Sequence, residues 1–183
     1  MEFDLLSQLW LHEANADAIA RAVRELGLPP ADPADLAVAY ADLFLLNVFP
    51  YGTVFTDEWG ELNGAAAEQV AALYAAQDYH PPELSEVAAP DHLGLCLGLL
   101  AHAQERGLPI GDFVLLVSEW APVCCLAVER EPGAHPFYRA LAARTRETLL
   151  AEIQNPNPKV QIPNPKSQIP NPKSEILNLQ SQV

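Results

Sequence analysis

The chain has 183 residues, of which 50% are hydrophobic, so it is long enough for one domain with a tail and too apolar to be disordered throughout. Ten Lys and Arg against 24 Asp and Glu give a formal net charge of −14. This is the wrong sign for neutralising phosphates, so the charge argues against a nucleic-acid partner.

The first half of the chain predicts three helices separated by loops. Apolar residues recur at steps of three and four from the N-terminus until a Gly-Leu-Pro-Pro stop, and Asp32 or Asp35 can cap the next helix. An aromatic, turn-rich segment then interrupts the helical period. The predicted helices cover residues 5–26, about 32–48 and 64–77, and the predicted ordered loops cover residues 49–60 and 78–89.

The second half predicts three more helices. The helix that begins near Pro90 is apolar on every side from Leu93 to Ala103, which is typical of a helix enclosed by others, and Gly107 ends it. Two further helices follow, from Asp112 to about Val128 and from His135 or Pro136 to Ile153, and no pair of strands with hairpin chemistry is present. The sequence therefore predicts an all-α fold, a compact bundle of about six helices in residues 1–153.

Residues 154–183 differ from the rest because they form a tandem repeat of seven residues, QNPNPKV, QIPNPKS, QIPNPKS and a decayed EILNLQS. Two prolines in each intact unit forbid helix, and each unit carries too little apolar surface to offset the entropy lost on ordering. We predict a disordered, extended Pro/Asn-rich tail of polyproline type.

The charge is concentrated before the tail. All three lysines lie beyond residue 154 and 23 of the 24 acids lie before it, so residues 1–154 carry a net charge of −16. Such a body attracts basic peptides and repels anionic membranes, although a large negative charge can also serve solubility alone. Both interpretations stay open on charge alone.

Neither a membrane anchor nor a redox or metal framework is predicted. No run of about 18 apolar residues lacks a charge or a proline, and the N-terminus opens with acids where a signal peptide needs basic residues. Cys124 and Cys125 are adjacent and Cys96 is remote, so no disulfide framework or CxxC pair can be written. We expect a cytoplasmic protein without membrane insertion, metal or other cofactor, whose cysteines are buried.

No familiar catalytic signature occurs, so an enzyme is hard to argue. Two local clusters still invite interpretation. Asp91 and His92 open the central helix, where they can bind a ligand or simply cap the helix and fill a loop. Tyr51, Phe55 and Trp59 recur at four-residue spacing and can form a groove for an amphipathic peptide or close the end of the bundle.

The order of several motifs resembles one known family. The motifs are Pro50-Tyr51-x-Thr53-Val54-Phe55, Gly64, Tyr74, Pro90-Asp91-His92-Leu93-Gly94, Trp120 and Phe137-Tyr138-Arg139-x-Leu141-Ala142-x-x-Thr145. Together they resemble the TorD/DmsD/NarJ family of redox-enzyme maturation chaperones, over roughly residues 1–153. The tail lies outside this likeness.

The resemblance implies an all-helical, non-catalytic cytoplasmic chaperone. Such a protein binds the precursor of a molybdenum enzyme, often at its twin-arginine signal peptide, and holds it until the molybdopterin cofactor is inserted. Asp91 and His92 match the family's acid–histidine pair, in the region implicated in peptide binding. Tyr51, Phe55 and Trp59 would line the neighbouring groove, and Glu86 (or Glu83) would supply a carboxylate because Ala88 and Ala89 stand where the family often carries a Glu.

Three alternatives stay open. The chaperone can contact the mature part of a client enzyme instead of its signal peptide, as the nitrate-reductase branch of the family does. A small metal-dependent enzyme using Asp91, His92 and Cys96 is the second alternative, and a helical adaptor is the third. The client and the oligomeric state stay open, and a homodimer formed by helix exchange between protomers is one of the states that such a bundle allows.

Overall fold

The computed structural model describes residues 2–60, 62–109 and 111–154. These residues form nine α-helices and no strand, which confirms the predicted all-α class. Two π-helical turns and one 3-10 turn extend or connect the helices. In chain order the elements are α1 (Glu2–Leu11), α2 (Ala16–Arg21), η1 (Ala22–Leu26), α3 (Pro33–Tyr40), η2 (Ala41–Asn47), α4 (Gly52–Thr56), α5 (Ala65–Ala76), η3 (Pro82–Ser85), α6 (Leu93–Arg106), α7 (Gly111–Ser118), α8 (Ala121–Arg130) and α9 (Pro136–Gln154).

The predicted number of about six helices was too low because two predicted helices are broken and one loop contains a helical turn. The first predicted helix is divided between Leu11, where α1 ends, and Ala16, where α2 begins. The extended Asn15 caps α2, because its side chain accepts from the Ala18 N–H at 2.9 Å. The helix predicted from Asp112 is divided at Trp120, next to a proline in the first turn of α8. The aromatic segment contains α4.

The helix boundaries predicted at Asp32, Gly27 and Gly107 are confirmed. Asp32 caps α3 by accepting from the Ala34 N–H at 2.8 Å, with Pro33 in the first turn. Gly27 and Gly107 end η1 and α6 in the left-handed region, at φ of 68° and 65°. Glycine adopts this conformation without the steric cost that a side chain would add.

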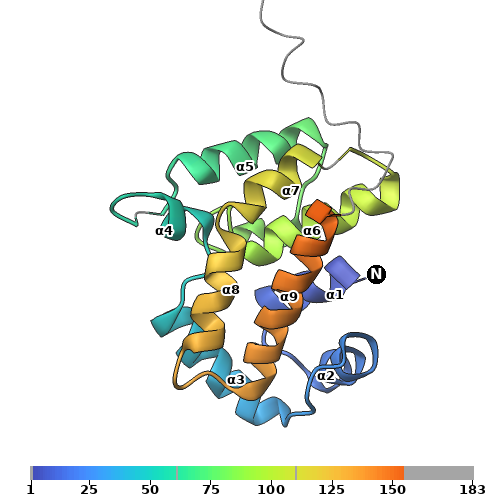
Figure 1. The fold of residues 1–183 in the computed structure, drawn as a ribbon, viewed down its shortest axis with the longest axis vertical. Helices are drawn as coiled ribbons and strands as arrows, with labels where there is room; N and C mark the ends of the chain where they lie inside the picture. The colour runs from blue at the N-terminus through green and yellow to red at the C-terminus, as the bar shows by residue number, and fades with distance from the viewer. Residues whose placement is uncertain (1, 61, 110, 155–183) are drawn as a thin grey trace, which may run out of the picture.

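The predicted central helix is the buried axis of the molecule. α6 packs along α1, and α9 crosses both in front of them in Figure 1, with α5 and α7 at one end and α2 and α3 at the other. Gly94 permits the close approach of α1, because a Cβ there would lie 3.1 Å from the Ser7 carbonyl. Ser7 Oγ donates to the Gly94 carbonyl at 2.7 Å, and Trp10 Nε1 donates to Thr145 Oγ1 at 2.9 Å, so α1 is attached to both α6 and α9.

The three cysteines are buried and unpaired, as predicted. Burial raises the pKa of Cys125 to about 12 and raises the pKa of the Cys96 and Cys124 thiols as well, so none of them is a ready nucleophile. The predicted disorder of the repeat tail concerns residues 155–183, which lie outside the described part of the chain.

Across the described ranges, no single helix is long and apolar enough to cross a bilayer. Together, α7 and α8 would be long and apolar enough, but the pair is bent by 40° at its junction.

Candidate functional site

Asp91 is completely buried and joins two elements that are distant in sequence. Its Oδ2 accepts from the backbone N–H and from the hydroxyl of Thr53, both at 2.6 Å, and its own carbonyl accepts from the Gly52 N–H at 3.0 Å. The side chain thus caps the first turn of α4 rather than α6, the helix that it precedes in the chain. Asp91 therefore fixes the aromatic segment against the start of the central helix, and presents no surface to solvent.

His92 is the cap of α6 and is also buried. Its Nδ1 accepts from the Gly94 N–H at 3.1 Å, and its backbone pairs with Tyr51 in an isolated antiparallel bridge. Burial lowers the pKa of His92 to about 4, so the imidazole is neutral at physiological pH. The neutral imidazole therefore caps the helix and fills the loop, and it offers no positive charge that could attract an anionic ligand.

Tyr51, from the aromatic segment, contacts His92 and the loop that leads to α6. Its ring meets the His92 ring edge-on, with centroids 5.0 Å apart, and its hydroxyl accepts from the Ala88 N–H at 3.2 Å. The Leu93 N–H donates to the Pro50 carbonyl at 2.8 Å. The structure therefore brings three of the six predicted site residues, Tyr51, Asp91 and His92, together at one junction between the aromatic segment and α6. Hydrogen bonds and one ring contact hold this junction.

Phe55 lies one turn further along α4 and packs on Trp120, the residue that precedes α8. Its ring is stacked on Trp120, with centroids 6.5 Å apart and planes inclined by 12°. Trp120 is buried and also covers Gly52, where a Cβ would lie 2.8 Å from its ring. Sequence reasoning did not assign Thr53 or Trp120 to the site, although both belong to the motifs that carry the family resemblance.

The last two predicted site residues are exposed. Trp59 follows α4 and is 80% exposed, with its backbone N–H held by Asp57 Oδ1 at 2.8 Å. Glu86 is exposed at the end of η3, and Glu83, the alternative carboxylate, is half-buried in the same turn. A tryptophan this exposed contributes little to the core, so its surface is free to contact a partner.

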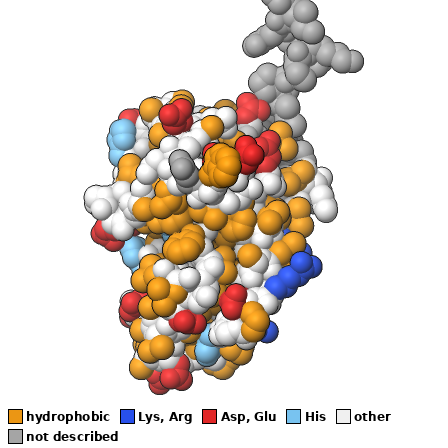
Figure 2. Space-filling view, turned by 90° about the vertical axis from the view of Figure 1, so that its left-hand side faces the viewer, with side chains coloured by type: hydrophobic (Ala, Val, Ile, Leu, Met, Phe, Trp, Pro, Cys, Tyr) orange, Lys and Arg blue, Asp and Glu red, His pale blue; other side chains and the backbone are white. Residues whose placement is uncertain are grey.

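An apolar face surrounds the aromatic segment. Figure 2 shows hydrophobic side chains gathered across the side of the molecule that carries α4, α8 and η2, with acidic side chains around them and Lys or Arg only toward one edge. We call this surface the apolar face. Among the elements on this side, η2, the aromatic segment and α8 expose large apolar side chains, namely Leu45, Leu46, Phe49, Trp59 and Val123.

The charge around this face is mainly negative because of where the arginines lie in the chain. No Lys or Arg occurs from residue 25 to residue 105, a stretch that carries 13 Asp and Glu. The three arginines of α9 are occupied elsewhere: Arg144 pairs with Glu2 and Arg146 with Glu129, each at 2.8 Å, and Arg139 donates to the carbonyls of Glu131 and Pro132. Four acidic residues near the aromatic segment and η3 pair with no arginine among the described residues, namely Asp57, Glu58, Glu83 and Glu86.

The side chains considered for metal chemistry are engaged in structural bonds. His92 Nδ1 is the helix cap, and Cys96 Sγ lies 4.0 Å from the hydroxyl of Tyr74 in a fully buried site. Within residues 2–60, 62–109 and 111–154, no three His, Cys, Asp or Glu side chains converge as metal ligands. The arrangement around Asp91 therefore positions the aromatic segment against the start of α6.

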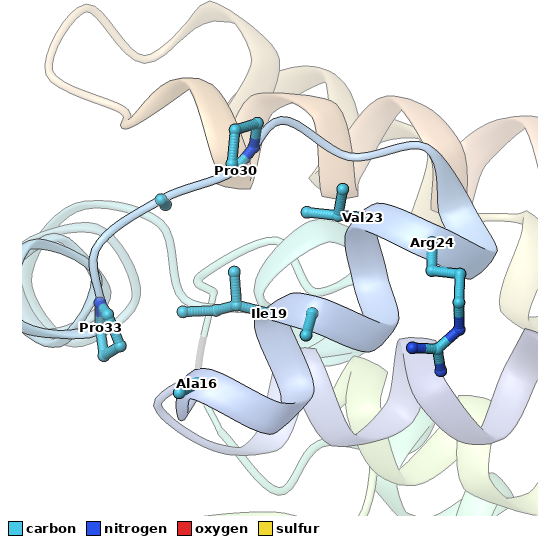
Figure 3. Close-up of a pocket in the computed structure, with 8 residues that line it drawn as sticks. Ala16, Ile19, Val23, Arg24, Pro30 and Pro33 are labelled. Atoms are coloured by element: carbon cyan, nitrogen blue, oxygen red, sulfur yellow. The ribbon is translucent and has the colours of Figure 1, made fainter.

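A separate apolar pocket of about 390 Å³ lies at the other end of the molecule, between α2, η1 and the segment that leads into α3. In Figure 3, Ile19 points into the space between the helix and Pro33, whereas Arg24 extends away from it. Arg24 already pairs with Glu25 at 2.7 Å. The pocket shares no residue with the predicted site.

A solved structure has the same fold. A crystal structure of a candidate redox enzyme maturation protein from Archaeoglobus fulgidus superposes with a TM-score of 0.58 at 22% sequence identity, covering 81% of this chain and 92% of the other. No curated protein matches the chain by sequence.

A family match covers the predicted site. The sequence model of the nitrate reductase delta subunit family matches residues 7–110, which include the aromatic segment, α5 and the start of α6. The match covers more than half of the chain. By this match and by its motif order, the chain belongs to the nitrate reductase delta subunit family, the TorD/DmsD/NarJ group of redox-enzyme maturation chaperones that serve molybdoenzymes.

Proposed function

We propose that this chaperone binds the twin-arginine signal peptide of a molybdopterin-dependent oxidoreductase precursor and holds the precursor in the cytoplasm while the cofactor is inserted. Binding is the whole of its activity, and no bond is made or broken on the chain. The observation that carries the proposal is the apolar face with unpaired carboxylates beside it, in a stretch of 81 residues without Lys or Arg.

The chemistry of such a peptide is complementary to this surface. A guanidinium group makes paired, charge-assisted hydrogen bonds with a carboxylate, and Asp57, Glu58 and Glu86 are exposed for this. The apolar stretch that follows the arginines in such a signal can lie on exposed side chains such as Trp59 and Phe49. Net repulsion of anions by the acidic body disfavours competing acidic segments.

Asp91 and His92 act in this proposal by positioning. Both are buried, so their contribution to binding is the placement of α4 and of the residues that follow it. This makes two roles distinguishable. Substituting a residue that touches the peptide changes affinity without changing stability, whereas substituting a positioning residue changes both.

The test is a titration of a labelled twin-arginine peptide against the purified full chain. We expect saturable binding that weakens as salt is added, and roughly tenfold weaker binding of a peptide with both arginines replaced by lysine, because lysine cannot form the paired contact. Glu86→Gln should weaken binding and reduce its salt dependence. Glu105→Gln is the matched control, since Glu105 is equally exposed but lies in the last turn of α6.

Equal affinity for the arginine and lysine peptides would contradict the proposal. A second arm uses the precursor without its signal peptide. If this truncated precursor is captured as tightly as the complete one, the contact lies on the mature part of the client, and the signal-peptide assignment is wrong.

A further inference from the structure

A second pocket lies directly beside the Asp91–His92 junction, and the peptide contacts proposed so far do not use it. Its volume is about 330 Å³, and it lies between the C-terminal half of α5 and the loop that leads to α6. We call it the α5 pocket. It is lined by Ala71, Tyr74, Ala75, Tyr79, His80, Pro81, Leu84 and Pro90.

The pocket exists because of small residues on one face of α5. Ala71 and Ala75 are four residues apart, so their side chains lie above one another on the helix and leave space that a larger residue would fill. Pro81, Leu84 and Pro90 from the following loop form the opposite wall. The lining is almost entirely apolar, which suits a hydrocarbon or aromatic side chain.

Two tyrosines make part of the lining rigid. The Tyr74 hydroxyl donates to the Pro90 carbonyl at 2.8 Å, and the Tyr79 ring meets the Tyr74 ring edge-on with centroids 5.3 Å apart. Burial raises the pKa of both hydroxyls well above the ordinary value, so both tyrosines are neutral at physiological pH. A preformed pocket costs little ordering entropy when a ligand enters.

Two acidic residues flank Leu84 at the η3 turn, and we call them the acidic rim. Glu83 immediately precedes the lining residue Leu84, and Glu86 follows two residues later. Neither pairs with an arginine within the part of the chain that the structure describes. Leu84 itself is 41% exposed, so apolar surface and free carboxylates occur together on the short turn η3.

We propose that the α5 pocket receives one large apolar side chain, Leu, Ile or Phe, of the same signal peptide, while an arginine of that peptide lies at Glu83 or Glu86. This inference rests on the proposed function and adds a subsite to it. The volume is at the low end for a ligand site, which fits one side chain better than a whole segment. The acidic rim selects a peptide that is basic as well as apolar.

The first test fills the pocket. Ala75→Trp places an indole in the space, and we expect peptide affinity to fall about tenfold or more, the loss that follows when a large apolar side chain can no longer be buried. Ala76→Trp is the matched control: the same change on the same helix, exposed, outside the lining and about 100° around the helix axis. It should bind as the wild type does.

The second test identifies the side chain that enters. A series of twin-arginine peptides, each with one apolar residue replaced by Ala, is titrated against wild type and Ala75→Trp. At one peptide position, replacement by Ala should weaken binding to the wild type strongly and binding to Ala75→Trp hardly at all, because two changes at one contact are not additive. If Ala75→Trp does not fold, Leu84→Ala, which removes a wall of the pocket, takes its place in the same cycle.

The outcomes separate the two proposals. Additive losses at every peptide position, together with normal arginine-dependent binding by wild type, would overturn the pocket and leave the proposed function standing. Equal losses in Ala75→Trp and Ala76→Trp would do the same. No binding of any twin-arginine peptide by the wild type would overturn both.

Discussion

Asp91 Oδ2 accepts two hydrogen bonds from Thr53, one from its backbone N–H and one from its hydroxyl, each at 2.6 Å. The two residues are 38 positions apart and both are fully buried. Their contact connects the aromatic segment to the central helix. A buried acid–histidine pair can therefore fix the position of α4 and of the exposed residues that follow it.

Substitution of either residue should destabilise the protein. Thr53→Val removes one of the two buried hydrogen bonds to Asp91 Oδ2 and should lower the free energy of unfolding by about 0.5–1.5 kcal/mol. Asp91→Ala, which also leaves the Thr53 N–H unpaired, should cost more, and the double variant should cost less than the sum because the pair shares one contact. Urea unfolding measures all three, with Glu105→Ala as a surface control that should stay within about 0.5 kcal/mol.

The same variants decide whether Asp91 touches the peptide. If it acts by positioning, Thr53→Val and Asp91→Ala should weaken peptide binding in proportion to their losses of stability. A direct contact would give a different pattern: strong loss of affinity in Asp91→Ala and wild-type affinity in Thr53→Val.

His92 should make stability depend on pH. Its pKa is about 4 in the folded chain and 6.5 ordinarily, so the unfolded state binds the proton first as the pH falls. The stabilisation is therefore complete above pH 6.5 and is lost as the pH falls toward 4. Between pH 7 and pH 5 the wild type should lose about 2 kcal/mol more unfolding free energy than His92→Asn, which keeps a helix-capping side chain.

Urea unfolding at several pH values gives this difference directly. Parallel pH profiles for wild type and His92→Asn would show that the imidazole is already protonated, or equally accessible, in the folded chain.

Local signals in the sequence predicted more of the fold than of the site. The caps at Asp32, Gly27 and Gly107 depend on neighbouring residues, so their chemistry could be inferred from the chain alone. The breaks at Asn15 and Trp120 were missed, because the apolar period continues across both while the backbone changes direction.

The site depends on contacts that no local pattern contains. Motif order placed Asp91 and the aromatic segment in the same region, but it did not indicate that Thr53 takes up the carboxylate. The stacking of Phe55 on Trp120 joins positions 65 residues apart and was likewise missed. The α5 pocket could not be anticipated either, since alanines in a helix predict helicity and not the space left beside them.

Gly52 should not tolerate a side chain. A Cβ at this position would lie 2.8 Å from the Trp120 ring, which is itself stacked on Phe55, so Gly52→Ala must displace the indole. We expect a loss of about 1–3 kcal/mol in unfolding free energy and a changed tryptophan fluorescence spectrum. Gly133→Ala is the control, because its Cβ would meet only Asp42 Oδ2 at 3.8 Å. Wild-type stability in Gly52→Ala would mean that Trp120 can move freely.

Trp59 offers the cleanest separation of binding from folding. Because it is 80% exposed, Trp59→Ala should change the unfolding free energy by no more than about 0.5 kcal/mol. Its loss should nevertheless weaken twin-arginine peptide binding about thirtyfold, the effect of removing an aromatic residue that anchors an interface, and the salt dependence of binding should be unchanged because no charge is removed. Fluorescence titration at two salt concentrations measures both quantities.

The control for this experiment is Leu150→Ala, an exposed apolar truncation on α9 that should leave affinity as it is. The comparison matters because any exposed apolar residue can add weak, unspecific contact. Equal small effects in Trp59→Ala and Leu150→Ala would show that the peptide does not lie on the apolar face beside α4. A large effect of Trp59→Ala at constant stability would place the peptide there, because an exposed ring can lower affinity only through the contact that it makes.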